Sequence, residues 1–109
     1  MQLKGKTAII TGSGRGLGKA IALKLAKMGA NIVLNDIENS DAIDLTAEEF
    51  KSQGFSVIVT KGDVRNIDDV ESMVQKAVEA FGKIDILVNN AGITKDNLML
   101  RMSLKDWDD

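Results

Sequence analysis

The sequence predicts an α/β protein in which a parallel β-sheet lies between two layers of helices. Short runs rich in β-branched residues alternate with longer segments whose apolar residues recur at helical spacing. Such alternation is typical of parallel strands joined by right-handed crossovers. A glycine-rich stretch, TGSGRGLG at Thr11–Gly18, separates the first run from the first helical segment and indicates a tight turn.

The first strand, the first helix and the second strand follow directly from this pattern. Lys6–Thr11 is a short apolar run that we expect to be a buried strand. A helix begins at Gly16, where the apolar period changes, and Gly29 is well placed to end it in a left-handed cap. Its expected buried face carries Leu17, Ala20, Ile21, Leu25 and Met28. The second strand is Asn31–Asp36.

A second helix and a third strand are expected next. Asp41–Gln53 is the helix, with Ser40 or Asp41 as its N-cap and Gly54 as its terminator, although its apolar stripe is weaker. Phe55–Lys61 is rich in β-branched residues and predicts the third strand.

The clearest helix begins after Asn66, a good N-cap residue, and ends at Gly82. Aspartates in its first turn suit the helix dipole. Its apolar residues share one helical face, at Val70, Met73, Val74, Ala77, Val78 and Phe81. Ile84–Asn89 is the fourth strand. Beyond Gly92 we expect polar, irregular chain and then the start of a helix at Ser103.

Length and composition restrict the classes of function. The 109 residues predict one domain spanning 1–109. A net charge of -2 without a basic stripe argues against nucleic-acid binding. The sequence contains no cysteine and no histidine, so we expect no metal site. The polar N-terminus and the short apolar runs indicate neither a signal peptide nor a membrane span, and we expect a cytoplasmic protein.

The glycine-rich turn is a candidate phosphate site. A helix N-terminus carries unpaired N–H groups and partial positive charge, and glycines allow a diphosphate to approach them. The spacing is T-G-x-x-x-G-x-G, formed by Thr11, Gly12, Gly16 and Gly18, and it matches neither the strict G-x-G-x-x-G fingerprint nor the P-loop pattern. Gly14 is not required by this spacing. A tight strand-to-helix turn that binds no ligand is the alternative.

Polar residues follow three further strands. Asp36 ends the second strand, where a carboxylate can accept hydrogen bonds from the ribose hydroxyls of an adenosine. Asp63 follows the third strand and is a candidate for contact with the adenine edge, and Asn89–Gly92 closes the fourth strand. The alternative for both aspartates is an ordinary turn residue. Because ligands bind at the carboxyl ends of parallel strands, these features favour a nucleotide site.

These motifs resemble the N-terminal half of the classical short-chain dehydrogenase/reductase family. The resemblance is carried in order along the chain by TGSGRGLG, by Asp63-Val64 and by NNAG at Asn89–Gly92. The stretch GITKDNLMLRMSLKDWDD is similar, more narrowly, to the 3-oxoacyl-[acyl-carrier-protein] reductases of fatty-acid synthesis. The resemblance implies an NAD(P)-dependent oxidoreductase with a Rossmann-like three-layer α/β/α fold and parallel strands in the order 3-2-1-4.

The resemblance also implies roles for particular residues. The adenosine and diphosphate side of the cofactor would be held by Gly12, Arg15, Gly16, Leu17 and Gly18. Asp36 would bind the adenosine ribose, and Asp63 and Val64 would contact the adenine. The ribose nearer the nicotinamide would pass close to Asn90, Ala91 and Gly92, while Asn89 would tie the central strands together.

Two residues give opposite indications about the cofactor. Reductases of this group usually use NADPH, and the Arg15 guanidinium suits a 2′-phosphate. The charge of Asp36 would repel that phosphate. A carboxylate fixed where the phosphate must sit is the stronger discriminator, so we predict NAD(H) in preference to NADP(H).

The family's chemistry depends on an Asn-Ser-Tyr-Lys group, and this sequence contains no tyrosine. We therefore expect an inactive, cofactor-binding fragment, truncated before a fifth strand. Its parent would meet acyl carrier protein, or would be another alcohol or steroid-type dehydrogenase. A small stand-alone module that binds nucleotide or self-associates is the alternative.

Truncation would leave the fourth strand at an edge of the sheet. This strand carries Ile84, Ile86, Leu87 and Val88. A bare apolar edge invites pairing with another chain, so we expect a homo-oligomer or a domain swap through the strand 4 region. A rearranged strand order that covers the edge is the alternative.

Overall fold

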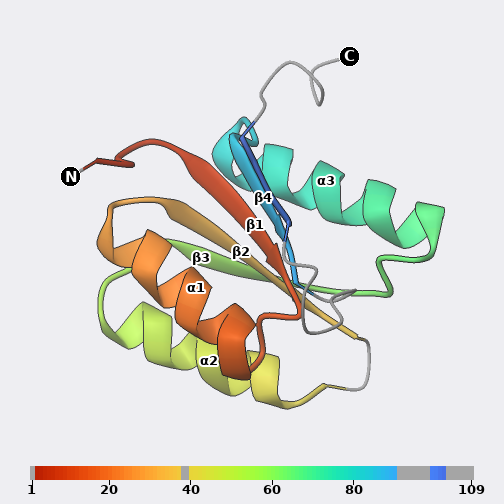
Figure 1. Cartoon of the computed structure of the whole chain (residues 1–109), viewed down its shortest axis with the longest axis horizontal. Coiled ribbons are helices and arrows are strands. Elements are labelled where there is room, and N and C mark those ends of the chain that lie inside the picture. Colours follow the sequence, from red (N-terminus) through yellow and green to blue (C-terminus); the bar gives the residue numbers. More distant parts are fainter. Residues whose placement is uncertain (1, 38–39, 91–98, 103–109) are drawn as a thin grey trace.

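The described residues form a β-sheet with helices on both faces (Figure 1). The computed structural model describes residues 2–37, 40–90 and 99–102. In chain order the elements are β1 (Thr7–Thr11), α1 (Gly16–Lys27), β2 (Asn31–Asp36), α2 (Ala42–Ser52), β3 (Val57–Lys61), α3 (Ile67–Phe81), β4 (Ile86–Asn89) and β5 (Met99–Met102). The predicted alternation of strands and helices is confirmed as far as β4.

The sheet has the order β3-β2-β1-β4-β5, and its first four strands are parallel. Ile9 of β1 lies in register with Val33 of β2 and with Leu87 of β4. Helices α1 and α2 cover one face and α3 covers the other (Figure 1). The predicted order 3-2-1-4 is therefore confirmed, and the carboxyl ends of four parallel strands meet at one edge.

A fifth, antiparallel strand that was not predicted joins the four parallel strands at the outer edge of β4. Met99–Met102 forms β5, which runs antiparallel to β4 and pairs Leu87 with Arg101 and Asn89 with Met99. Four residues, three of them apolar, do not by themselves distinguish a strand from a loop. Residues 99–102 become a strand because they pair with the backbone of β4. Because β5 covers the outer edge of β4, self-association through a bare β4 edge loses its structural basis.

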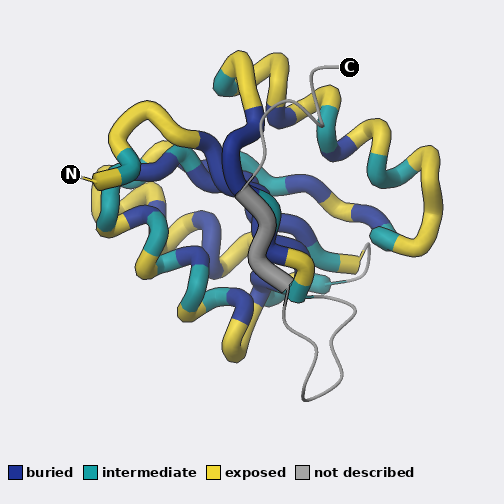
Figure 2. The backbone as a smooth tube through the Cα atoms, turned by 45° about the horizontal axis from the view of Figure 1, so that its top comes forward, coloured by how far each residue is buried: buried dark blue, intermediate teal, exposed yellow. Residues whose placement is uncertain are grey.

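The core consists of two apolar layers, one on each face of the sheet. The larger layer lies under α1 and α2 and includes Ile10, Leu34 and Phe50. The smaller lies under α3 and includes Ile9 and Met73. Figure 2 shows burial concentrated in the strands, as expected for a parallel sheet covered on both faces. This core fixes the strand ends that carry the candidate site.

Helix α1 does not bury the face that its large apolar residues predict. Its buried residues are Gly18, Ala22 and Ala26, which recur every four positions. Leu17 is 55% exposed, and Ile21 is only partly buried. Small side chains allow the helix backbone to lie close to the sheet. The row of residues with the smallest side chains therefore faces the sheet. Hydrophobicity alone misplaced this face because it ignores how closely the two layers approach.

The predicted ends of the helices are mostly confirmed. Gly29 and Gly82 both have positive φ angles, of 100° and 82°. Asn66 caps α3 by accepting hydrogen bonds from the backbone of its first turn. Asp41 occupies the N-cap position of α2, but its side chain makes no capping hydrogen bond. The helix predicted from Ser103 lies outside the described residues.

Candidate functional site

The turn between β1 and α1 leaves the start of α1 open to a ligand. Gly12 and Gly16 have φ angles of 63° and 64°, which L-residues with side chains rarely adopt. A Cβ at Gly16 would meet none of the described residues within 4 Å, so this glycine serves the backbone conformation and leaves space beside the turn. The N-cap residue Arg15 gives no side-chain cap, and the first turn contains no acidic residue. Such a helix start suits an anion.

Gly18 serves a different purpose, which is close packing. A Cβ there would collide with the Gly12 carbonyl oxygen and would lie 2.6 Å from Nδ2 of Asn90. That Nδ2 donates a hydrogen bond to the Gly12 oxygen at 3.0 Å, and the Asn90 backbone N–H donates to the Thr11 hydroxyl at 2.9 Å. The Thr11 hydroxyl in turn lies 3.2 Å from Oδ1 of Asn89. Asn89 therefore ties β4 to β1, as the resemblance implies.

The carboxylate of Asp36 is fixed by two backbone N–H groups at the end of β2. Its Oδ2 accepts from Gly14 at 3.1 Å, and its Oδ1 accepts from Ile37 at 2.8 Å. A cleft of about 290 Å³ opens beside it, lined by Arg15, Asp36, Ile37, Ser40, Asp41 and Ala42. Arg15 and Asp36, which give opposite indications about the cofactor, thus line the same cleft.

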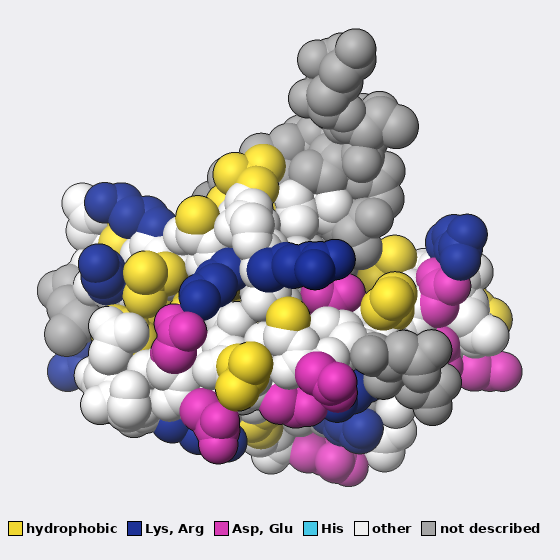
Figure 3. All heavy atoms as spheres, turned by 90° about the horizontal axis from the view of Figure 1, so that it is seen from below, with side chains coloured by type: hydrophobic (Ala, Val, Ile, Leu, Met, Phe, Trp, Pro, Cys, Tyr) yellow, Lys and Arg dark blue, Asp and Glu magenta, His cyan; other side chains and the backbone are white. Residues whose placement is uncertain are grey.

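Helix α2, which lies beside this cleft, makes two exposed ion pairs with its neighbours. Glu49 of α2 pairs with Lys19 of α1 at 3.0 Å, and Asp44 pairs with Lys61 of β3 at 2.8 Å. The Asp44 carboxylate raises the pKa of Lys61 through this hydrogen bond. Figure 3 views the molecule from the α2 side and shows basic and acidic side chains mixed across that face. The pairs orient α2 against its neighbours rather than forming a patch of one sign.

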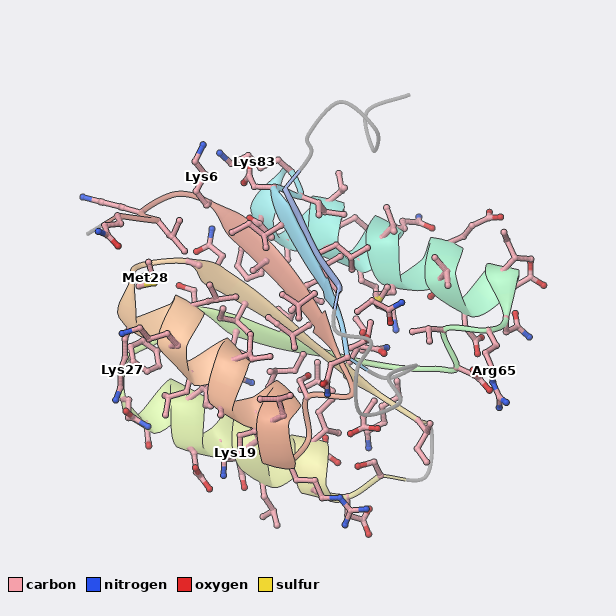
Figure 4. The ribbon with its side chains drawn as sticks, in the orientation of Figure 1. Lys6, Lys19, Lys27, Met28, Arg65 and Lys83 are labelled. Carbon is pink, nitrogen blue, oxygen red and sulfur yellow. The ribbon has the colours of Figure 1, made fainter. Side chains whose placement is uncertain are left out.

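Asp63 is already paired in this structure. Both of its carboxylate oxygens accept from the Arg65 side chain, with the shortest contact at 2.7 Å from Nη2. The Arg65 side chain and its backbone N–H lower the pKa of Asp63 to about 2. Arg65 lies between β3 and α3 (Figure 4). Val64 lines a separate cleft of about 200 Å³ on the α3 side, with Thr11, Val70, Met73, Leu87 and Asn89.

The predicted site residues therefore gather at the carboxyl ends of β1 to β4. Gly12 to Gly18 form the turn, Asp36 ends β2, Asp63 and Val64 follow β3, and Asn90 follows β4. The two remaining predicted site residues, Ala91 and Gly92, lie outside the described residues.

A buried polar network beneath the turn was missed by sequence reasoning. The Ser13 hydroxyl donates to the Asn35 carbonyl at 3.2 Å and accepts from the Asn35 N–H at 2.9 Å. The Asn35 side chain donates to the Thr60 hydroxyl at 3.1 Å. Thr46 of α2 donates to the Gly14 carbonyl at 2.6 Å. The available signal was Asn35, a polar residue directly after the apolar centre of β2 at residues 32–34.

A larger cleft lies elsewhere and carries none of the predicted site residues. It measures about 620 Å³ and lies at the opposite end of the sheet, lined by Lys4, Ala26, Lys27, Gly29, Gln53, Gly54, Phe55 and Ser56. Among the described residues, no helix has the length and hydropathy needed to cross a bilayer. The same residues contain no cluster of three or more side chains suited to hold a metal.

A sequence model of the short chain dehydrogenase family matches residues 6–109, which is nearly all of the chain. The chain belongs to the short chain dehydrogenase family. It is 43% identical over 104 residues to the 3-oxoacyl-[acyl-carrier-protein] reductase FabG of Staphylococcus epidermidis. This match covers 95% of the chain and 43% of the relative, so the chain spans less than half the length of that reductase.

Solved structures of the family share the fold. A short chain dehydrogenase/reductase from Burkholderia phymatum in complex with NAD matches with a TM-score of 0.75 and 38% identity, covering 80% of this chain and 31% of that one. A hydroxysteroid dehydrogenase from Escherichia coli matches with a TM-score of 0.79 and 40% identity, covering 84% of this chain and 39% of that one. The Rossmann-like fold is thereby supported, and the Burkholderia phymatum relative binds the dinucleotide NAD.

The described residues fit such a dinucleotide. The open space at Gly16 and the uncapped start of α1 suit a diphosphate. The Asp36 carboxylate has capacity left, since two oxygens offer about four acceptor positions and two backbone N–H groups use one each. Oδ1 of Asn90 is buried and has no hydrogen-bond partner among the described residues. The N–H groups at the start of α1 and the oxygens of Asp36 and Asn90 therefore all lie at the carboxyl ends of the parallel strands.

Proposed function

We propose that this chain is the cofactor-binding part of a cytoplasmic NAD(H)-dependent short-chain reductase. The complete enzyme would reduce 3-oxoacyl-[acyl-carrier-protein] to the 3-hydroxyacyl form in fatty-acid synthesis, and acyl carrier protein would be its partner. Residues 1–109 would act as one dinucleotide-binding domain. The observation that carries this proposal is the fixed Asp36 carboxylate beside the uncapped start of α1.

Each part of the dinucleotide would meet a different strand end. Gly12 and Arg15 to Gly18 would hold the diphosphate and the adenosine side. Asp36 would accept from the adenosine ribose hydroxyls, and Asp63 and Val64 would contact the adenine. Asn90, with Ala91 and Gly92, would border the second ribose. The bound nicotinamide would supply the hydride that reduces the substrate carbonyl.

The preference for NAD(H) follows from the fixed position of Asp36. The free positions on the Asp36 carboxylate accept hydrogen bonds. Ribose hydroxyls can donate to them, whereas a 2′-phosphate cannot. A phosphate there would also meet the carboxylate's like charge. Arg15 lines the same cleft and would offset part of this repulsion. The two N–H bonds keep the carboxylate from turning away, so the repulsion should prevail.

Calorimetric titration of the 109-residue chain with NADH and with NADPH tests this proposal. We expect NADH to bind more tightly, and Asp36→Ala to weaken NADH while strengthening NADPH. Glu48→Ala is the matched control, because it removes one exposed carboxylate from α2 without touching the site. Tighter binding of NADPH by the wild-type chain would contradict the cofactor preference, and absence of binding by either would contradict the function itself.

The chain alone should not turn over substrate. The family's proton donor is a tyrosine, and the sequence contains neither tyrosine nor histidine to take that role. Incubating the chain with NADH and a 3-oxoacyl thioester should leave the NADH absorbance unchanged. Steady oxidation of NADH would show that a different group supplies the proton.

A second candidate is a hydroxysteroid or other alcohol dehydrogenase. The Escherichia coli hydroxysteroid dehydrogenase is 40% identical over the matched region, comparable with the reductase match. The described residues hold the cofactor end of the site, which both kinds of enzyme need.

A further inference from the structure

We propose that Gly14 is a positioning residue for cofactor choice. Its backbone N–H and its lack of a side chain hold the Asp36 carboxylate in the orientation that selects an unphosphorylated ribose. This inference rests on the proposed dinucleotide function. It assigns a role to the one glycine of the turn that the T-G-x-x-x-G-x-G spacing leaves unexplained.

The contact between the two residues is direct and leaves no spare room. The Gly14 N–H donates to Oδ2 of Asp36 at 3.1 Å. A Cβ at position 14 would lie 2.6 Å from that same oxygen and 3.1 Å from the backbone nitrogen of Ile43. Real Cβ atoms do not approach a neighbour to 2.6 Å, so a side chain here must move something.

The part that would move is the carboxylate rather than the turn. Gly14 is not among the glycines with positive φ, so an alanine there would not be forced into the left-handed region. Its carbonyl is held by the Thr46 hydroxyl at 2.6 Å, and the preceding Ser13 is hydrogen-bonded to Asn35 through both backbone and side chain. The Ile43 nitrogen belongs to α2 and is buried. The Asp36 side chain can rotate, whereas these backbone groups cannot.

Displacing the carboxylate changes the cleft's selectivity. Asp36 would lose the Gly14 hydrogen bond and would no longer present its free acceptor positions in one fixed direction. Arg15, which lines the same cleft together with Asp41, would then attract a 2′-phosphate with less opposition from the Asp36 carboxylate. An alanine at position 14 should therefore weaken NADH and favour NADPH, although the substituted residue carries no charge.

The test is the ratio of the NADPH to the NADH dissociation constant, measured by calorimetry on the full chain. Gly14→Ala should lower this ratio about tenfold, the size expected when one hydrogen bond to a charged group is lost. In an Asp36→Ala background the same substitution should leave the ratio unchanged, since the group it acts through is gone. A merely destabilised fold would weaken both cofactors alike and would not show this coupling.

Gly62→Ala is the control for a crowded glycine. Its Cβ would also meet an aspartate, with Asp69 Cβ at 3.0 Å, and its N–H donates to the backbone carbonyl of Asp36 rather than to the carboxylate. It should leave the ratio unchanged even if overall affinity falls. If Gly14→Ala does not fold, Thr46→Val provides the second variant. It releases the Gly14 carbonyl and should lower the ratio severalfold in the same direction.

The outcomes separate this inference from the function on which it rests. If the wild-type chain binds neither NADH nor NADPH, the proposed function fails and the inference fails with it. If the wild type binds and the ratio is unchanged in Gly14→Ala, or equally changed with and without Asp36, only the positioning role fails. A lowered ratio that depends on Asp36 supports both.

Discussion

Gly18→Ala is predicted to damage the site by driving α1 away from the glycine turn. The added Cβ would collide with the Gly12 carbonyl oxygen and would lie 2.6 Å from Nδ2 of Asn90. The nearest obstacle is backbone, which cannot rotate aside. Relief therefore requires a shift of α1 or the loss of the 3.0 Å hydrogen bond from Asn90 to Gly12.

The expected cost combines these two effects. Overpacking of a crowded position costs about 1–3 kcal/mol, and one lost hydrogen bond adds about 1 kcal/mol. The free energy of unfolding should fall by about 2–4 kcal/mol. Each kcal/mol lowers the midpoint of thermal unfolding by about 4–8 °C in a domain of this size. NADH binding should be lost together with this stability, because the same shift moves the start of α1.

The assay is urea unfolding followed by circular dichroism, with NADH titration in parallel. Gly54→Ala is the matched control, since its φ is +87° and its Cβ would meet nothing within 4 Å. It should cost only about 1–2 kcal/mol of backbone strain and should leave NADH binding intact. The packing argument would be refuted if the free energy of unfolding of Gly18→Ala lay within about 0.5 kcal/mol of the wild-type value, a difference typical of neutral surface changes.

Three further predictions concern other parts of the molecule. Asn66→Ala should lower the free energy of unfolding by about 1 kcal/mol in urea, because α3 loses its cap; Asp41→Ala, whose side chain makes no capping bond, should change it far less. Arg65→Gln should raise the pKa of Asp63 from about 2 toward its ordinary 3.8 in an NMR carboxyl titration. Since the pKa of Asp63 is depressed, the stabilisation from this pair is present above about pH 3.8 and is lost as pH falls toward about 2, and an unshifted titration in the variant would disprove the pairing. Phe50→Ala should cost about 3–5 kcal/mol, because the ring is fully buried between α2 and the sheet, and a loss below 1 kcal/mol would contradict its place in the core.

Most of the fold could be predicted because its signals are local. Asn66 and Gly82 mark the ends of α3 by short-range chemistry, and both have the roles their residue types indicate. The strand Asn31–Asp36 was predicted with its observed bounds, since a run of β-branched residues between turn signals needs no tertiary information. The strand order came from the family resemblance, which the parallel pairing of β1 with β2 and β4 confirms.

The features that sequence reasoning missed all depend on contacts between distant segments. The buried face of α1 is set by how closely the helix approaches the sheet, and this favours Ala22 and Ala26 over larger neighbours. Pairing with β4 makes a strand of Met99–Met102, where the local pattern is too short to decide. The role of Gly14 requires knowing that Asp36 lies against it, across 22 residues of sequence. A spacing motif describes the turn without describing what surrounds it.

The rigidity of the glycine turn thus comes from its neighbours rather than from the glycines. Glycine has more conformational freedom than any other residue, so a turn rich in it would be a poor cofactor support on its own. Here Ser13 is bonded to Asn35, Gly14 to Asp36 and Thr46, and Gly12 to Asn90. The ends of two strands, β2 and β4, and helix α2 therefore hold the backbone in place before any ligand arrives, and less binding energy is needed to order it. The glycines leave space for the dinucleotide, while the polar residues around them determine the shape of that space.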